Sequence, residues 1–308
     1  MTLKLTGYVD LPANINPGGF DHAAIHRATS RLYVAHTCND ALDVIDCATD
    51  RYLHSLPNLT GVAGALVSDE RNLVFTSNRG ENTVGIFSPD DDANIIKIDV
   101  GVRPNGLAYD FKHNLLLAAN ACDPAIPNSF TVSVVDVNQR AMIANTPVLG
   151  RTRWTVFDAD ADVFYVNISD PAQIVVVNAN DLSRLARAFE IPVAGPHGLD
   201  LDLAHHRLFC ACDGKQLVVV DTQSGMTTNQ VEINGVPDVI FFNAALKRLY
   251  IAIGDPGIIE VFDTDAIRRI ETVTTEKGVH TLAFDAERNK VYAFLPQTHR
   301  AAVYLDKE

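Results

Sequence analysis

The sequence predicts an all-β fold, a closed ring of seven blades with four antiparallel strands each. A phrase made of a short apolar strand, an Asp-type turn and a strand like RLYVA occurs seven times. Its copies begin at Asp21, Ala63, Asn105, Arg153, His197, Asp238 and His280, so their starts lie 42, 42, 48, 44, 41 and 42 residues apart. A strand-only period of about 40 residues is typical of β-propellers. Continuous apolar runs such as LVVV and LYIAI indicate sheets buried on both faces, as in stacked blades.

Each copy accounts for one blade. In the fifth copy, HGLDLDLAHH is the expected inner strand with its turn, RLFCACDG the second strand, QLVVVDTQSG the third and MTTNQVEI the outermost. The sixth copy divides in the same way. An aspartate ends most third strands and inner strands, where its carboxylate can accept a backbone hydrogen bond and close the turn. These aspartates are Asp46, Asp136, Asp221 and Asp263, and Asp110, Asp158, Asp202 and Asp285.

The last copy, residues 280–306, stops after three strands. Residues 3–12 (LKLTGYVDLP) have the pattern of the other fourth strands, so we expect the N-terminal strand to complete this blade. Closure of the ring in this way removes two exposed sheet edges. The repeat then accounts for residues 1–308 as a single domain.

The composition argues against some classes of binding partner. The net charge of −13, without a cluster of Lys and Arg along the sequence, argues against a nucleic-acid partner. No apolar run reaches the roughly 18 residues of a membrane span, so no membrane partner is expected. The N-terminus lacks the pattern of a secretory signal, and the five cysteines form no C-x-x-C pair. We therefore expect packed thiols and a cytoplasmic protein.

The first residue of each copy carries the functional signal, because six of the seven are polar. Inner strands line the channel of a propeller, so these residues should meet at one mouth. His197, Asp238, His280 and Asp21 come from neighbouring blades and alternate imidazole with carboxylate. Such a set suits a divalent cation, namely Zn, Mn, Fe or Mg. His22 and His36 lie beside them, and with His197 and His280 they form the predicted catalytic set.

Residues suited to hold a substrate lie on the other side of the ring. Asn105 and Arg153 can orient a carbonyl or carboxylate, and Asn78 and Asn120 follow second strands that should end at the same mouth. The loop at 121–130 can overhang the mouth as a partial lid. Trp154 should turn into its blade by strand alternation and pack in the core.

Particular segments resemble known families. RLYVAHTCNDALDVID, RLYIAIGDPGIIEVFDT and NKVYAFLPQTHRAAVYLD resemble the YVTN family of β-propeller repeats, over essentially the whole chain. GPHGLDLD (from Gly195) and GVHTLAFD (from Gly278) are similar to repeats of virginiamycin B lyase and lactonase-type propellers. That second resemblance implies a divalent cation or catalytic His and acidic residues at the mouth, in positions that His197 and Asp238 match.

Two hypotheses follow. The first is a metal-assisted hydrolase or lyase that opens a lactone or ester of a small-molecule substrate at the channel mouth. The second is a non-catalytic propeller that binds a protein or small ligand, in which the polar channel residues bind ordered water.

Overall fold

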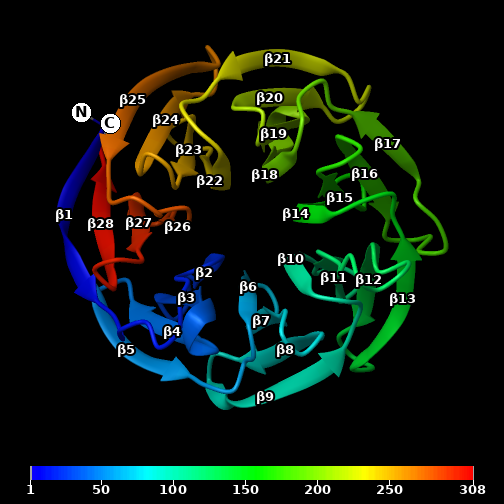
Figure 1. Ribbon diagram of the computed structural model, residues 1–308, viewed down its shortest axis with the longest axis horizontal. Helices are drawn as coiled ribbons and strands as arrows, with labels where there is room; N and C mark the ends of the chain where they lie inside the picture. The colour runs from blue at the N-terminus through cyan, green and yellow to red at the C-terminus, as the bar shows by residue number, and fades with distance from the viewer. Residues whose placement is uncertain (1, 308) are drawn as a thin grey trace.

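Seven four-stranded antiparallel sheets form a closed ring in the computed structural model, which describes residues 2–307 (Figure 1). This confirms the predicted seven-bladed β-propeller. Blade 1 contains β2 (Ala23–His26), β3 (Arg31–His36), β4 (Ala41–Asp46) and β5 (Arg51–Leu56). Blade 2 contains β6 (Val62–Ser68), β7 (Leu73–Asn78), β8 (Thr83–Ser88) and β9 (Asp91–Asp99). Blade 3 contains β10 (Pro104–Asp110), β11 (Leu115–Asn120), β12 (Thr131–Asp136) and β13 (Ala141–Pro147).

The remaining blades repeat this order. Blade 4 contains β14 (Thr152–Asp158), β15 (Val163–Ile168), β16 (Gln173–Asn178) and β17 (Arg187–Glu190). Blade 5 contains β18 (Pro196–Asp202), β19 (Arg207–Cys212), β20 (Gln216–Asp221) and β21 (Thr227–Glu232). Blade 6 contains β22 (Pro237–Asn243), β23 (Arg248–Ile253), β24 (Ile258–Asp263) and β25 (Arg268–Thr274). Blade 7 contains β26 (Leu282–Asp285), β27 (Lys290–Leu295), β28 (Arg300–Asp306) and β1 (Leu3–Asp10).

The helical content is small. Two short 3₁₀ helices, η1 (Thr37–Asn39) and η2 (Leu203–His205), lie between strands. Within the described part of the chain, no helix has the length and apolar character needed to cross a bilayer.

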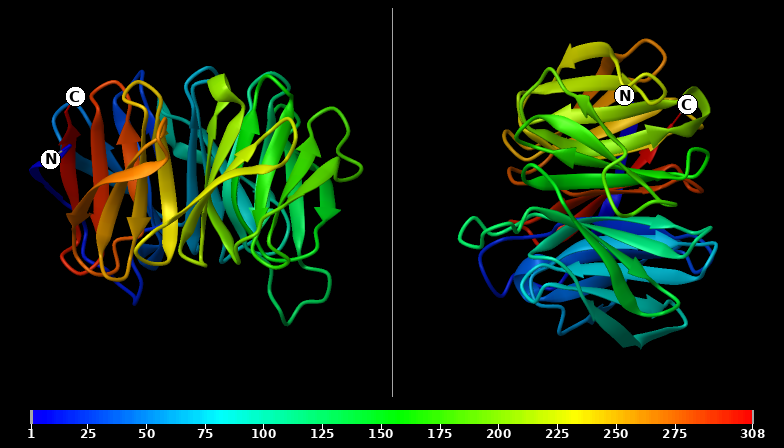
Figure 2. Two further views of the ribbon diagram at one scale, coloured as in Figure 1. Left: turned by 90° about the horizontal axis from the view of Figure 1, so that it is seen from above. Right: turned by 90° about the vertical axis from the view of Figure 1, so that its right-hand side faces the viewer.

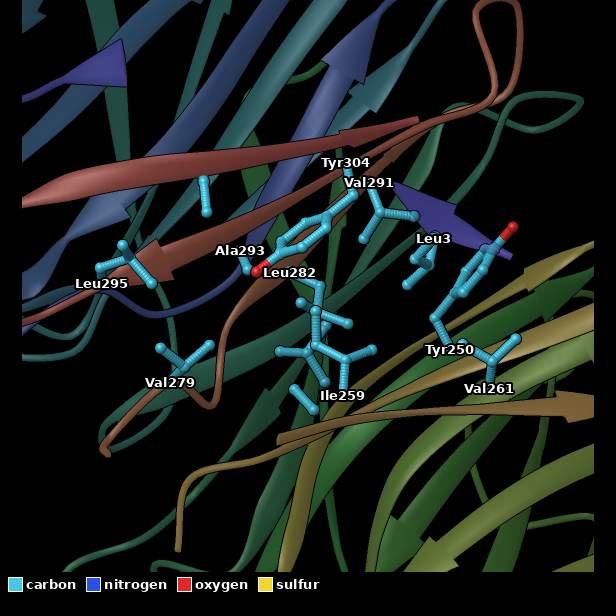
Figure 3. Close-up of a cluster of buried hydrophobic side chains, with 13 residues drawn as sticks. Leu3, Tyr250, Ile259, Val261, Val279, Leu282, Val291, Ala293, Leu295 and Tyr304 are labelled. Carbon is cyan, nitrogen blue, oxygen red and sulfur yellow. The ribbon is translucent and has the colours of Figure 1, made fainter. Parts of the chain in front are cut away.

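The N-terminal strand closes the ring as predicted. β1 pairs antiparallel with β28, from Leu3 opposite Asp306 to Asp10 opposite Arg300. Leu3 is 1% exposed and belongs to a cluster with Tyr250 of blade 6 and Val291 of blade 7 (Figure 3). The first strand of the chain therefore joins the last blade in both its backbone pairing and its core.

The core lies between adjacent blades. Each hydrophobic cluster combines strands of two neighbouring sheets, and both faces of the second and third strands are buried. This explains their continuous apolar sequences. The predicted aspartate turns are present: Asp46 accepts the backbone N–H of Ala48 at 2.8 Å, and Asp110 accepts that of Lys112 at 2.8 Å.

The inner strands are irregular at their first residues. In blades 2 to 6 the pairing with the second strand skips the first residue of the repeat, which therefore lies in a β-bulge. A bulge breaks the alternation of side chains and re-aims the extra residue. The loop between β11 and β12, which includes residues 121–130, projects beyond its neighbours on one face of the ring (Figure 2).

Candidate functional site at the channel mouth

A chain of imidazoles and carboxylates crosses blades 5 to 7 at the mouth. His197 Nδ1 lies 2.7 Å from Asp213 Oδ1, and His197 Nε2 lies 3.3 Å from Asp238 Oδ1. The other oxygen of Asp238 lies 2.9 Å from His280 Nδ1. The structure therefore brings together three residues that are far apart in sequence, His197, Asp238 and His280, with one carboxylate bridging two imidazoles.

These contacts change the acidity of each member. Burial opposes a charge on His197, but Asp238 and the hydrogen bond with Asp213 outweigh it and raise the pKa of His197 to about 9. Burial also opposes a charge on His280, and its hydrogen bond with Asp238 raises that pKa above the ordinary value. Although burial acts to raise the pKa of Asp238, the neighbouring His197 holds it well below its usual range. At neutral pH, Asp238 is a carboxylate and His197 is an imidazolium.

An arginine and amide network occupies the other side. Arg79, at the end of a second strand, donates to Asp21 Oδ2 at 3.0 Å and also to Asn105 Oδ1. Arg153 Nη1 lies 3.2 Å from His197 Nε2, and Arg153 Nη2 lies 3.6 Å from Asp213 Oδ2. Asp21 is thus paired with Arg79, and its Oδ1 lies 3.2 Å from His22 Nε2, whereas no ion pair joins it to His280 among the described residues.

His22 and Trp154 meet across the channel. Their ring centroids are 4.0 Å apart, although they belong to blades 1 and 4. Trp154 also packs against the cluster between blades 6 and 7. The expectation that Trp154 packs in the core of its blade is confirmed, because Trp154 also packs against the cluster that includes Tyr165 and Val176 of blade 4. The contact with His22 across the channel was not predicted, and it follows a bulge at the start of β14. His22 is 5% exposed, and burial lowers its pKa, so this predicted catalytic histidine is neutral and enclosed.

Beyond this pair the channel is apolar. A cavity of about 400 Å³ is lined by His22, Trp154, Phe157, Phe241 and neighbouring inner-strand residues. Two carboxylates belong to that lining, Glu70 of blade 2 and Asp200 of blade 5, and Asp200 accepts the backbone N–H of Phe242 at 2.6 Å. Burial raises the pKa of Asp200 to about 6.

Three predicted site residues lie inside blades. His36 is fully buried, with Nδ1 2.8 Å from Asp43 Oδ2 and Nε2 2.9 Å from Asn14 Oδ1. Asn78 donates to Thr83 Oγ1 at 3.0 Å, and it is fully buried. Asn120 is equally buried and donates to hydroxyl groups of blade 3. The expectation that these three side chains reach the mouth was wrong, because the last residues of their strands face the adjoining strand.

The predicted metal ligands are arranged as ion pairs. Within residues 2–307, no group of three or more His, Cys, Asp or Glu side chains is placed to hold a metal ion. Asp238 with His197 and His280 has donor types that suit a divalent cation. To bind one, the two imidazoles would have to turn their nitrogens away from the carboxylate oxygens that they now face.

Sequence reasoning assigned no role to two residues that organise the mouth, although both belong to the loops expected there. Asp213 and Arg79 come directly after their second strands, whereas the buried Asn78 and Asn120 are the last residues of theirs. The sequence did not show where each strand ends to within one residue. The repeat pattern could have indicated Asp200, because a carboxylate is unusual at its position in the repeat. The matching residues of the other blades are all apolar, namely Ala24, Leu66, Ala108, Val156, Phe241 and Ala283.

Comparison with known proteins supports the propeller fold but shows no family for this chain. No family model matches the chain, and no curated protein matches its sequence. Among solved structures, 1773 chains are similar to this protein. One, titled "Crystal Structure of Mitotic Checkpoint Complex", is 11% identical with a TM-score of 0.82, over 99% of this chain and 92% of the other. Another, from Kuenenia stuttgartiensis hydrazine synthase, is 13% identical with a TM-score of 0.80, over 96% and 97%. At such identities these structures share the propeller fold alone.

Proposed function

We propose that this propeller is a hydrolase or lyase that opens a lactone or ester of a small molecule at the channel mouth. His280 is the proton-transfer residue in this proposal. The observation that supports it is the Asp238 carboxylate bound to His280 Nδ1, while 39% of the His280 side chain stays exposed. Within the described residues, His280 Nε2 has no hydrogen-bond partner, so it is available to a substrate.

The carboxylate defines how His280 would work. The Asp238 carboxylate lies 2.9 Å from Nδ1 and favours a proton on that nitrogen, which leaves Nε2 to exchange a proton with a substrate. Nε2 can then take a proton from water, or from the carbon next to a leaving group, and return it to the departing oxygen. The His197 imidazolium and Arg153 provide positive charge for the oxygen on which negative charge develops. Asn105 and Arg153 orient the polar end of the substrate.

A divalent cation at the mouth is the alternative to proton transfer by His280, because an imidazole that binds a metal must be neutral and cannot also act as a free base. Asp238, His197 and His280, with Asp21, are the residues that would hold it, and it would polarise the substrate carbonyl. Elemental analysis of untagged protein, before and after the pair of changes His197→Ala and His280→Ala, tests this part. Absence of metal from wild-type protein supplemented with Zn, Mn, Fe or Mg would remove it.

The catalytic part is tested with a panel of lactones and aryl esters. His280→Gln should lower kcat by about 100-fold or more, since general acid–base catalysis contributes that much. Its matched control is His205→Gln, because His205 lies in η2 at the opposite end of the inner strand and bonds Asp202. Equal activity of His280→Gln and wild type on a turned-over substrate would contradict the role of His280.

A non-catalytic binding function is the competing proposal, and the loop between β11 and β12 favours it. This loop projects from the ring and exposes Ile126, which is 46% accessible (Figure 2). Capture of a protein partner that depends on residues 121–130, with the mouth substitutions silent, would support this function. The YVTN resemblance is compatible with either function. Five free, buried cysteines favour a reducing compartment, so we include a cytoplasmic location in both proposals.

A further inference from the structure

Four arginines gather on one side of the channel mouth of an acidic protein. Arg79 and Arg103 line a hollow of about 400 Å³ on blades 2 and 3, beneath Asp123 and Ile126 of the projecting loop. Arg153 lies at the start of the next inner strand, and Arg151 precedes it by two residues. In a chain of net charge −13, such a concentration of cations departs from the acidic average of the sequence.

Two of these arginines lack a counter-charge. Within residues 2–307, neither Arg103 nor Arg151 forms an ion pair or a side-chain hydrogen bond. Burial lowers the pKa of Arg151, and the positive charges of Arg153, Arg79 and Arg103 lower it further. The buried Nε atoms of Arg79 and Arg153 also have no partner among the described residues. The carboxylate of the nearby Asp123 accepts the N–H of Ala125 in its own loop, and among the described residues it forms no ion pair with these arginines.

The repeat shows that the two unpaired arginines are departures from the structural pattern. The residue two places before each copy is glycine or valine in the other five blades: Gly19, Gly61, Gly195, Val236 and Gly278. Blades 3 and 4 have Arg103 and Arg151 there. Arg103 has a φ of 58°, close to the 60° of Gly61 and the 69° of Gly195. This left-handed conformation suits glycine and is unfavourable for other residues, so arginine is not there to build the turn.

We propose that Arg103 and Arg151, with Arg79 and Arg153 beside them, form an anion-binding site, and that the ligand is a small molecule carrying two or more carboxylate or phosphate groups. Guanidinium groups bind both kinds of anion in the same bidentate geometry. This inference builds on the proposed function, because it names the class of substrate that the His280 side of the mouth would act on.

Calorimetric titration with citrate, and separately with pyrophosphate, tests the site at low salt. We expect one site per wild-type chain for at least one probe, and the probe that binds shows whether carboxylate or phosphate is preferred. The double variant Arg103→Gly with Arg151→Gly should weaken that binding by about tenfold or more, since it removes two charged hydrogen-bonding groups. These substitutions restore the residue that other blades use, so the fold should tolerate them.

The matched control is Arg140→Gly. Arg140 has a φ of 55° and lies in the turn between β12 and β13, at the end of the blade away from the mouth. Arg140→Gly removes the same charge as Arg103→Gly, from the same left-handed backbone conformation. Binding of the probe should therefore change by less than about twofold. The proposal is overturned if wild-type protein binds neither probe at about 10 mM. It is also overturned if the double variant binds as wild type does, or if Arg140→Gly weakens binding equally.

The melting temperature with and without each probe provides a second readout, because a ligand that binds the folded state raises it. His280→Gln separates this inference from the proposed function. That variant should keep the binding of the probe, because His280 lies on the other side of the mouth. Wild-type protein that binds the probe but turns over no lactone or ester, or a His280→Gln variant with unchanged activity and intact anion binding, would mean that the catalytic proposal had failed and the anion site had not.

Discussion

The two ends of the central channel are built from the same seven strands and have opposite character. At the mouth, the first residues of the repeats form ion pairs and hydrogen bonds around His197, Asp238 and Arg79. Three residues further along the same strands, the lining is apolar in six blades, and Asp200 is the exception. His22 and Trp154 lie between the two ends. A repeat therefore determines the scaffold, and single positions within it determine the local chemistry.

Loss of the N-terminal strand should have the largest effect, because both ends of the channel depend on a closed ring. Deletion of residues 1–12 exposes the edge of β28 and the surroundings of Leu3 and Val9, which are 1% and 3% exposed. We expect the free energy of unfolding to fall by about 4 kcal/mol or more. Chemical denaturation measures it. In the same strand, Leu3→Ala should cost about 2–4 kcal/mol and Leu5→Ala, at an exposed site, less than about 1 kcal/mol.

The rings of Trp154 and His22 form a partition between the two ends of the channel, and Trp154→Ala should remove it. The loss of a large, half-buried side chain should lower the free energy of unfolding by about 2–4 kcal/mol. Burial no longer lowers the pKa of His22 as strongly, so that pKa should rise toward its ordinary value. NMR titration of His22 checks the rise, with Trp154→Phe as the variant that keeps the partition. An unchanged His22 pKa in Trp154→Ala would show that Trp154 does not shield this ring.

At the apolar end, the contribution of Asp200 to the free energy of unfolding should change over its own pH range. The pKa of Asp200 is about 6 in the folded protein, above the ordinary 3.8, so the fold favours its protonated form. Its contribution to stability is present below about pH 4 and is lost as the pH rises through 6. Asp200→Asn should remove about 1–3 kcal/mol of this pH dependence between pH 4 and 7. Unfolding curves at several pH values measure it, and parallel profiles of variant and wild type would contradict it.

At the mouth, the contribution of His197 to the free energy of unfolding should be lost over a different pH range. The pKa of His197 is about 9 in the fold and 6.5 ordinarily, so its contribution is fully present below pH 6.5 and is lost as the pH rises through 9. His197→Gln should flatten the stability profile between pH 6.5 and 9 by about 1–2 kcal/mol and leave the acidic window of Asp200 in place. Profiles in which both variants affect the same window would show that the two ends titrate together.

The fold could be predicted from the sequence because the repeat is local and strong. Seven copies of one strand pattern, with aspartates at the turns, indicated the blades, and the incomplete last copy indicated the role of β1. The site could be predicted only in part. The pattern placed His197, Asp238 and His280 on neighbouring inner strands, and the structure brings them within hydrogen-bonding distance.

The rest of the site depends on side-chain direction. His36 and Asn78 end second strands and are buried, whereas Asp213, directly after its second strand, reaches His197. Strand alternation has a period of two and fails wherever a bulge adds a residue, as at Arg153 and Trp154. The sequence by itself determined the number of blades and the closure of the ring, because both follow from apolar pattern and turn chemistry. Only the tertiary structure decided which polar side chains meet, because that depends on bulges and on contacts between blades that no single strand encodes.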